Sequence, residues 1–174
     1  YLNQSLIELK IVTSLNKKFS INNDNNFHII SVYDYFFFQE HLCIIFELLN
    51  ENLYQLLQHN HLQGISLNSI NFIIKQILEA IEQVHRMGII HCDIKPENIL
   101  LKINIEKNKS DISVKLTDFG SACIKNNPIF TIVQSLFYRA PEVILGIPYT
   151  QSIDIWSIGL VAIELFLGGP LLQS

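Results

Sequence analysis

Cysteine and basic residues are both scarce in this sequence of 174 residues. Its only three cysteines, Cys43, Cys92 and Cys123, are widely spaced and form no CxxC pair. The sequence therefore predicts neither a disulfide framework nor a structural zinc site, and a reduced, intracellular setting fits best, in the cytoplasm and/or the nucleus. Lys and Arg number 12 against 16 Asp and Glu, a formal net charge of -4. Because no basic excess attracts polyanions, we expect no nucleic-acid partner and no anionic membrane surface as partner.

Long apolar runs are also few, and only residues 153–172 suggest a membrane span. That stretch contains Asp154 and Glu164, and a Gly-Gly-Pro break follows Leu167. The remaining run is too short for the hydrocarbon core, so we expect a buried core helix. No secretory segment opens the chain, and its first residue is Tyr1; we expect either that the sequence begins within a protein or that its start has been removed.

Apolar periodicity predicts one α+β domain, with a strand-bearing portion before a mostly helical one. A composition of 49% hydrophobic and 16% charged residues excludes a disordered chain. Residues 2–16 read as an amphipathic helix, and the Asn- and Lys-rich residues 16–26 read as a surface loop. The apolar runs 29–38 and 42–48 flank a short polar turn, which predicts a β-hairpin.

The rest of the chain reads as helices around two small strands. Residues 52–59 predict a short helix. A long helix begins after Ser66, a plausible N-cap, and ends at Gly88. Two short runs, 99–102 and 113–116, read as strands that a variable polar loop joins.

The chemistry-bearing residues lie in the stretch HCDIKPENILL (91–101) and in Asp118-Phe119-Gly120, which begins 20 residues after Asn98. Phosphoryl transfer needs a carboxylate to orient the attacking hydroxyl, a cation to offset charge on the transferring group, and oxygen ligands for Mg²⁺. Asp93, Lys95, Asn98 and Asp118 supply those groups in that order. A metal pair of His91 with Cys92 is the weaker interpretation, because no further ligand follows at useful spacing.

The sequence resembles a eukaryotic protein kinase of the CMGC group, most closely the dual-specificity tyrosine-regulated (DYRK-like) kinases. The resemblance rests on HCDIKPENILL, with Cys92 where most kinases carry Arg, and on DFGSAC, QSLFYRAPEVILG and DIWSIGLVAIEL. It covers residues 4–172, apart from the Asn-rich loops. It implies a protein-kinase-like bilobal fold that is incomplete here: helix αC, a β-hairpin and the hinge in residues 1–48, and a mostly helical C-lobe in residues 49–174.

The resemblance also implies roles for the catalytic residues, with ATP and Mg²⁺ as cofactors and a protein as substrate. Asp93 would be the catalytic base, and Lys95 would steady the γ-phosphate. Asn98 and Asp118 would hold Mg²⁺. Asp154 would hold the backbone of the catalytic loop, although from the sequence alone it also reads as an N-cap.

A second group of expected site residues would surround the nucleotide. Glu8 would be the helix-αC glutamate, which in isolation reads as a solvated helix residue. Phe46 would be the gatekeeper, Glu47 to Leu49 the hinge beside the adenine, and Leu100 the residue under it; Phe46 and Leu100 would be ordinary core residues in another fold. The stack that aligns the lobes would comprise Val12, His91 and Phe119.

The chain departs from the family at its start and at its end. No G-x-G-x-x-G strand and no third-strand lysine precede Glu8, and the family's helices after Leu172 are not in the sequence. Glu142 would then lack its arginine partner, and a buried carboxylate without a partner is costly. We expect residues 1–174 alone to fold poorly and to transfer no phosphate.

The activation segment, residues 118–142, also departs from the nearest family. Phe130 and Ile132 replace two tyrosines, and Leu136 replaces the arginine that would bind the phosphotyrosine. Our hypothesis is that an apolar contact of Ile132 with Leu136 holds the segment without phosphorylation. Thr131 and Ser135 remain possible phosphate acceptors, which leaves this point open. Cys92 likewise replaces a phosphate-reading arginine, so Arg139 is the cation left nearby.

Three functions compete at this point. A protein Ser/Thr or dual-specificity kinase is favoured by the four intact polar groups. A pseudokinase or regulatory fragment that acts as a binding module is favoured by the missing nucleotide lid. A small-molecule kinase is disfavoured by the run RAPEVILG, which by resemblance would build a platform for peptide substrates. The protein substrate, the oligomeric state and the preference between Ser/Thr and Tyr are not readable from the sequence.

Overall fold

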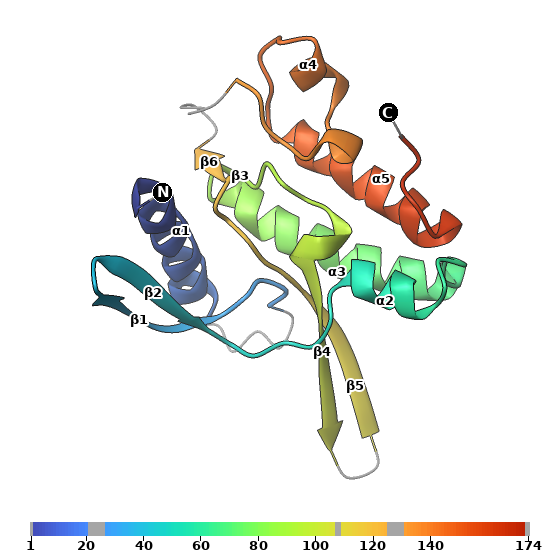
Figure 1. Ribbon diagram of the computed structural model, residues 1–174, viewed down its shortest axis with the longest axis horizontal. Helices are drawn as coiled ribbons and strands as arrows, with labels where there is room; N and C mark the ends of the chain where they lie inside the picture. Colours follow the sequence, from blue (N-terminus) through green and yellow to red (C-terminus); the bar gives the residue numbers. More distant parts are fainter. Residues whose placement is uncertain (1, 21–26, 107–108, 125–130, 173–174) are drawn as a thin grey trace.

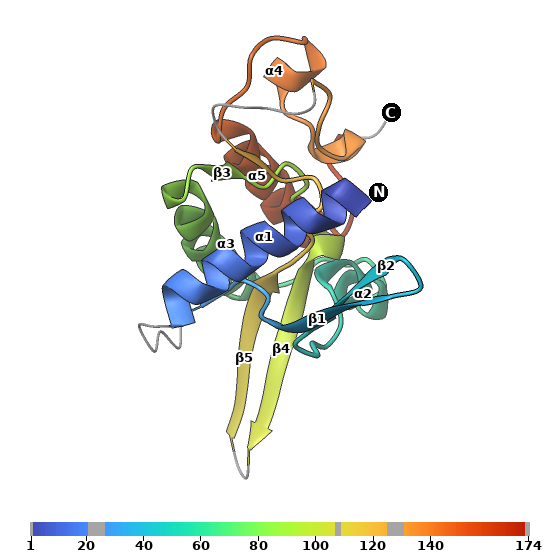
Figure 2. The ribbon, with the colours of Figure 1, turned by 90° about the vertical axis from the view of Figure 1, so that its left-hand side faces the viewer.

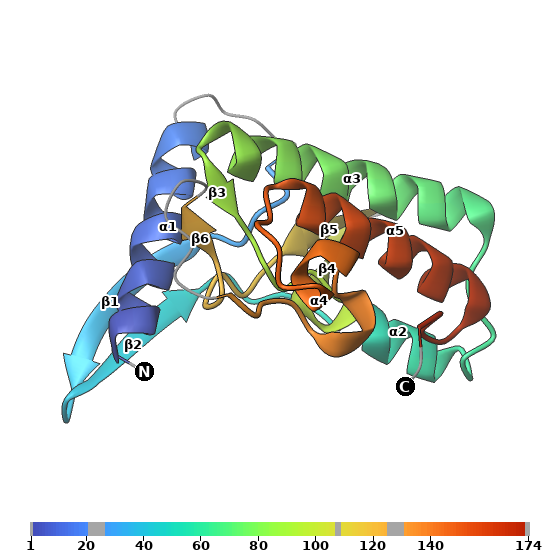
Figure 3. The ribbon, with the colours of Figure 1, turned by 90° about the horizontal axis from the view of Figure 1, so that it is seen from above.

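The computed structural model describes residues 2–20, 27–106, 109–124 and 131–172 (Figure 1). Its helices and strands are α1 (Leu2–Ser20), β1 (Val32–Phe38), β2 (His41–Phe46), α2 (Leu53–His59), α3 (Leu67–Arg86), β3 (Ile89–Ile90), β4 (Ile99–Glu106), β5 (Lys109–Leu116), β6 (Cys123–Ile124), α4 (Pro141–Ile144) and α5 (Ser152–Leu167). Viewed from above, α1 and the β1–β2 hairpin lie at one end and α2 at the other, and α3 runs between the two ends with α5 beside it (Figure 3). The expected α+β class is confirmed, with two portions that correspond to parts of two lobes.

The long helix α3 forms the centre of the helical portion, as its periodicity predicts. The Ser66 side chain accepts a hydrogen bond from Ser69 N at 3.2 Å, which caps the first turn. Gly88 has a φ of 71° just beyond the last turn, a conformation that glycine adopts without strain. One face of α3 is buried and packs beside α5 (Figure 3). Its buried apolar residues are Ile70, Ile73, Ile77, Ala80, Ile81 and Val84.

The hairpin β1–β2 is confirmed, with antiparallel pairing from Val32 with Phe46 to Phe38 with His41. Its turn residues have φ values of 44° and 65°, so two non-glycine residues occupy the left-handed positions of a tight hairpin turn. The predicted start of the first strand at residue 29 is wrong. Ile29 instead forms a parallel bridge with Leu116 and is fully buried, which ties the N-terminal portion to the second sheet.

Helix α1 is longer than predicted, because it continues through residues 16–20, where the sequence predicts a loop. The side chain of Asn16 explains part of the extension. Its Nδ2 donates to Ile30 O at 3.0 Å, and its Oδ1 accepts from Val32 N at 2.7 Å. Phe19 stacks on Phe27 with ring centroids 5.8 Å apart. The end of the helix is therefore fixed by tertiary contacts that composition does not reveal.

Strands β4 and β5 are also longer than predicted and form an antiparallel ribbon that projects away from the helices (Figure 2). The expected loop between residues 102 and 113 contributes eight strand residues: 103–106 and 109–112. The segment looks polar by composition, but apolar residues occupy every second position, as in a strand: Ile99, Leu101, Ile103 and Ile105.

Helix α5 ends at Gly168, which has a φ of 85°, so the expected break after Leu167 is confirmed. Its buried face includes Ile153, Val161 and Leu165, whereas Trp156 on its outer face is 42% exposed. The expected core helix is therefore buried on one face. None of the helices in the described ranges combines the length and the hydropathy that a bilayer crossing needs.

Candidate active site

A buried aspartate in the first turn of α5 fixes the loop between β3 and β4. Asp154 is 1% exposed. Its Oδ2 accepts from His91 N at 2.9 Å and its Oδ1 from Cys92 N at 3.0 Å, while His85 Nε2 lies 2.8 Å from Oδ2. The expected role in holding this loop is confirmed. The N-cap interpretation is wrong, since α5 begins at Ser152 and Gln151 is its N-cap.

The His91 ring links this loop to the end of β5 and to Phe119. Its Nδ1 accepts from Asp93 N at 3.3 Å, so the proton is on Nε2, which donates to Thr117 O at 3.0 Å. The ring packs edge-on against Phe119, with centroids 4.8 Å apart. His91, Phe119 and Val12 of α1 are all fully buried, as the expected stack requires.

The structure does not support a metal site at His91 and Cys92. Among the described residues, no group of three His, Cys, Asp or Glu side chains could hold a metal ion. Cys92 Sγ instead lies 3.6 Å from Cys123 Sγ, and all three cysteines are free. The two buried thiols are 31 residues apart in the sequence and adjacent in space.

The carboxylate of Asp93 lies in a cluster of donors. Lys95 Nζ donates to Oδ2 at 2.8 Å, and Ser135 Oγ donates to Oδ1 at 2.7 Å. Asn98 Nδ2 donates to Asp93 O at 2.9 Å and lies 3.2 Å from Oδ2. Burial alone would raise the pKa of Asp93, but the hydrogen bonds from Lys95 and Ser135 outweigh it and hold that pKa below its usual value of 3.8. The carboxylate is thus ionised and fixed at both oxygens.

Ser135 is the residue of this cluster that sequence reasoning missed, because it was considered only as a phosphate acceptor. It lies 42 residues from Asp93 in the sequence, so no local pattern joins the two. Lys95 Nζ also donates to Ser135 Oγ at 3.0 Å, which closes a triangle of Asp93, Lys95 and Ser135. The activation segment therefore contacts the catalytic loop directly.

Asn98 and Asp118 become neighbours through Thr117. Thr117 N and Oγ1 both donate to Asn98 O, at 2.9 and 3.1 Å. Asp118 is exposed, has a φ of 61°, and accepts from Gly120 N at 3.2 Å. Because Asn98 directs its amide nitrogen to Asp93, its amide oxygen and the Asp118 carboxylate are the ligands on offer. An all-oxygen donor set of this kind fits Mg²⁺.

Glu8 of α1 reaches this region, as the helix-αC assignment requires. Burial, and then the negative charge of Asp118, raise the pKa of Glu8, and a backbone hydrogen bond from Phe119 partly offsets them. The Glu8 carboxyl therefore lies close to the Asp118-Phe119-Gly120 turn. No lysine among the described residues contributes to the shift in the pKa of Glu8.

The expected hinge residues differ in how they are held. Phe46, at the end of β2, and Leu49 are half-buried and pack against the core, and Leu100 on β4 is half-buried. Leu48 is 96% exposed. The Glu47 side chain is buried among ion-pair partners, so its contact with an adenine would come from its backbone.

Gln134 anchors the described part of the activation segment. It is 7% exposed and has a φ of 66°. Its Nε2 donates to Ile153 O at 2.9 Å and to Ser157 Oγ at 2.8 Å, and its Oε1 accepts from Ala140 N at 2.8 Å. Its own carbonyl accepts from Arg139 Nη2 at 2.8 Å. One polar side chain thus joins the segment to α5.

These contacts correct two expectations for the segment. The side chains of Ile132 and Leu136 are 70% and 57% exposed, so a buried contact between them does not hold it. Glu142 is half-exposed rather than buried, and Ser152 Oγ lies 3.4 Å from its carboxylate. Phe130 lies outside the described residues.

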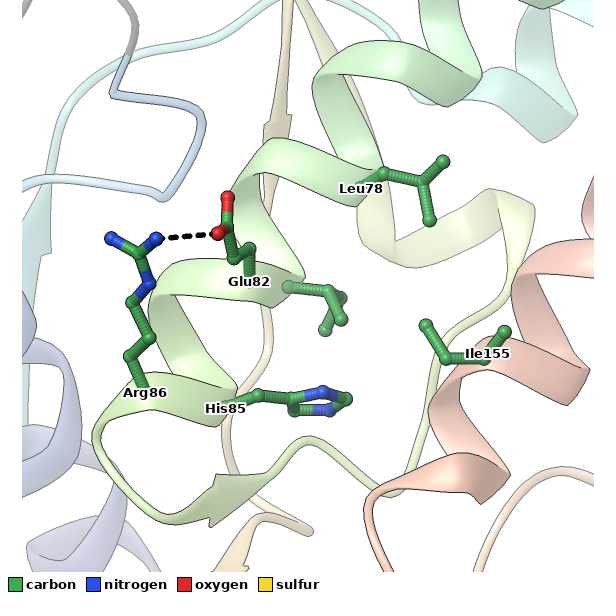
Figure 4. Close-up of a pocket in the computed structure, with 6 residues that line it drawn as sticks. Leu78, Glu82, His85, Arg86 and Ile155 are labelled. Atoms are coloured by element: carbon green, nitrogen blue, oxygen red, sulfur yellow. Dashed lines mark hydrogen bonds and ion pairs between the residues drawn. The ribbon is translucent and has the colours of Figure 1, made fainter.

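A hollow of about 470 Å³ lies between α3 and α5, away from Asp93. Leu78 and Ile155 face it from the two helices, and an ion pair of Arg86 with Glu82, 2.6 Å long, lies at its edge (Figure 4). The hollow holds none of the expected site residues and touches the catalytic loop only through His85, which binds Asp154.

Fold and site together define a kinase-type phosphotransferase domain. A helix and a hairpin pack beside a helical portion, the loop before β4 is fixed to a buried aspartate, and the activation segment closes on the Asp93 carboxylate.

The protein kinase domain family matches residues 5–174, and the chain belongs to this family. The "Dual specificity protein kinase YAK1 homolog" of Arabidopsis thaliana is 47% identical over 171 residues, which are 98% of this chain and 17% of that protein. The human "Dual specificity tyrosine-phosphorylation-regulated kinase 4" is 45% identical over 168 residues, 97% of this chain and 31% of that protein. The "Probable serine/threonine-protein kinase dyrk2" of Dictyostelium discoideum is 47% identical over 171 residues, 97% of this chain and 18% of that protein. The resemblance to the DYRK-like kinases is confirmed, and the chain spans less than a third of the length of each of these three relatives.

Proposed function

We propose that this protein is an ATP-dependent protein kinase, of serine/threonine or dual specificity, that works inside the cell. The observation that carries the proposal is the Asp93 carboxylate, which Lys95 and Ser135 hold at both oxygens. Its lowered pKa keeps it ionised and able to accept a hydrogen bond from a substrate hydroxyl. The names of the relatives, which are dual-specificity and serine/threonine protein kinases, support the same activity.

In this proposal, Asp93 orients the attacking hydroxyl and accepts its proton. Because two donors fix the carboxylate before substrate arrives, little reorganisation is needed when the reaction occurs. Lys95 offsets negative charge on the transferring γ-phosphoryl group, and its contact with Ser135 holds its ammonium group beside Asp93. Ser135 positions the base from the activation segment.

Asn98 and Asp118 would hold Mg²⁺, which when bound neutralises charge on the phosphates of ATP. Glu8 would contribute from α1 as the helix-αC glutamate. The adenine would lie against a wall of residues from the hinge and β4. That wall would comprise Phe46, the backbone of Glu47, Leu49 and Leu100.

The test is transfer of labelled phosphate from MgATP to a peptide library by the full-length protein and its Asp118→Asn variant. We expect the variant to lose transfer by a factor on the order of 10² to 10³, since one essential electrostatic group is removed. Asp34→Asn is the matched control, because Asp34 is exposed on β1, and its activity should equal that of the unmodified protein. Equal activity of Asp118→Asn and the unmodified protein would contradict the proposal. A protein that transfers nothing but captures a partner would be a binding module instead.

A further inference from the structure

A buried carboxylate lies where the N-terminal portion continues into the helical portion. Glu47 directly follows β2, and its side chain is 3% exposed. Its Oε1 accepts from Ser31 N at 2.9 Å, and its backbone N donates to Ser31 O at 2.9 Å. The side chain and the backbone of Glu47 therefore both bind Ser31, which directly precedes β1.

Two lysines from the β4–β5 ribbon meet the same carboxylate. Lys102 Nζ donates to Oε2 at 2.8 Å, and Lys115 Nζ lies 3.1 Å from Oε1. Lys115 is 6% exposed, and its Nζ also donates to Ile29 O at 3.0 Å and lies 5.0 Å from the centroid of the Phe27 ring. Each charged atom of the pair therefore has several partners, as a buried ion pair requires.

The ribbon presents these lysines on the face that carries Leu100. Lys115 is the direct cross-strand partner of Leu100, and Lys102 is two residues further along β4. Residues directly opposite or two apart point to the same face of a ladder. The hinge leads to the edge of β4: Asn50 N donates to Leu101 O at 2.9 Å beyond the exposed Leu48. Glu47 before Leu48 and Asn50 after it thus fix the two ends of the hinge.

We propose that Glu47, through Lys102 and Lys115, is a positioning residue that sets the hinge backbone against Leu100 and so determines nucleotide affinity. The inference rests on the proposed kinase function. A buried ion pair adds little stability over apolar residues of the same volume, so its contribution here is geometry. It fixes the distance between the hinge peptide and Leu100, the two sides between which the flat base would bind.

The test compares three variants of the full-length protein: Glu47→Gln, the double variant Glu47→Gln with Lys115→Met, and Glu51→Gln. The last is the matched control, because Glu51 lies four residues along and pairs at 2.7 Å with His59, whose side chain is 75% exposed. The measurements are the Kd of MgADP by calorimetry, KM and kcat for MgATP, and Tm. The double variant leaves no unpaired buried charge at this pair, so it separates positioning from stability.

We expect Kd and KM to rise about tenfold in Glu47→Gln, with kcat within about twofold, because ground-state and transition-state binding are lost equally. In the double variant, Tm should recover while Kd and KM stay raised. Unchanged Kd and KM in Glu47→Gln, or their recovery with Tm in the double variant, would overturn the inference. If Glu47→Gln does not fold, the double variant decides alone. An unmodified protein that binds no MgADP and transfers no phosphate would overturn the proposed function instead.

Discussion

Truncation of Gln134 to alanine should loosen the activation segment from α5. The change removes an amide whose Nε2 donates to Ile153 O and Ser157 Oγ and whose Oε1 accepts from Ala140 N. Ser157 Oγ keeps a partner, since it also donates to Tyr138 O at 2.8 Å. Ala140 N loses its acceptor, and Ala140 is fully buried, whereas Ile153 O keeps the N–H of Ser157 one turn along α5.

The magnitude follows from this one buried N–H group. A buried donor or acceptor that loses its partner costs about 1–3 kcal/mol, so Gln134→Ala should lower the free energy of unfolding by about 1–3 kcal/mol. A domain of this size has a total of about 5–15 kcal/mol, so the loss is a large share. Ser135 follows in the chain and contacts Asp93 at 2.7 Å, so we also expect kcat to fall.

Urea unfolding and steady-state kinetics of the full-length protein measure the two effects. Gln58→Ala is the matched control, because Gln58 is exposed on α2, and its effect should stay within about 0.5 kcal/mol. The reasoning fails if Gln134→Ala is no more destabilising than Gln58→Ala. The expected effect on the site is wrong if Gln134→Ala lowers stability but the folded variant keeps the kcat of the unmodified protein.

Three further predictions test other contacts. Asp154→Ala leaves two buried backbone N–H groups without an acceptor and should lower the free energy of unfolding by about 2–6 kcal/mol in urea. The control Asp34→Ala, at an exposed residue, should lower it by about 0.5 kcal/mol or less, and equal costs would refute the role of Asp154 in holding the loop. Gly168→Ala would place a Cβ 1.8 Å from Leu62 O at a φ of 85°, so Tm should drop by an amount that corresponds to about 2–5 kcal/mol, and an unchanged Tm would contradict the contact. Burial lowers the pKa of His28 from 6.5, so the contribution of His28 to stability is complete above pH 6.5 and is lost as pH falls through the lowered value. Between pH 7 and 5, the Tm of His28→Asn should therefore fall less steeply than that of the unmodified protein, and identical slopes would contradict this prediction.

The clustering of polar side chains in the loop before β4 could be predicted from the sequence because these residues are close along the chain. Asp93, Lys95 and Asn98 lie within six residues, and a loop this short leaves few ways to arrange them. The capped, periodic helix α3 was predictable for a similar reason, since Ser66, the apolar face and Gly88 all agree.

Contacts across the chain were not predictable in this way. Ser135 meets Asp93 over 42 residues, and Asn16 extends α1 by binding residues 14 and 16 positions away. Polar residues read as loop when composition is judged alone, which is why the ends of α1, β4 and β5 were missed. Ile132 and Leu136 are both exposed, and the hydrogen bonds of Gln134 to α5 hold the segment instead.

The apolar helix α5 carries three buried polar side chains because each of them binds another segment of the chain. Asp154 holds the catalytic loop, Ser157 accepts from Gln134, and Glu164 accepts from Tyr138 OH at 2.6 Å. At 100° per residue, these positions lie within about 80° of one another on the helix surface, so a single face serves both segments. Burial raises the pKa of Glu164, which shows that the helix bears a cost in ionisation there. An apolar replacement would keep the helix, but the catalytic loop or the activation segment would lose its fixed place.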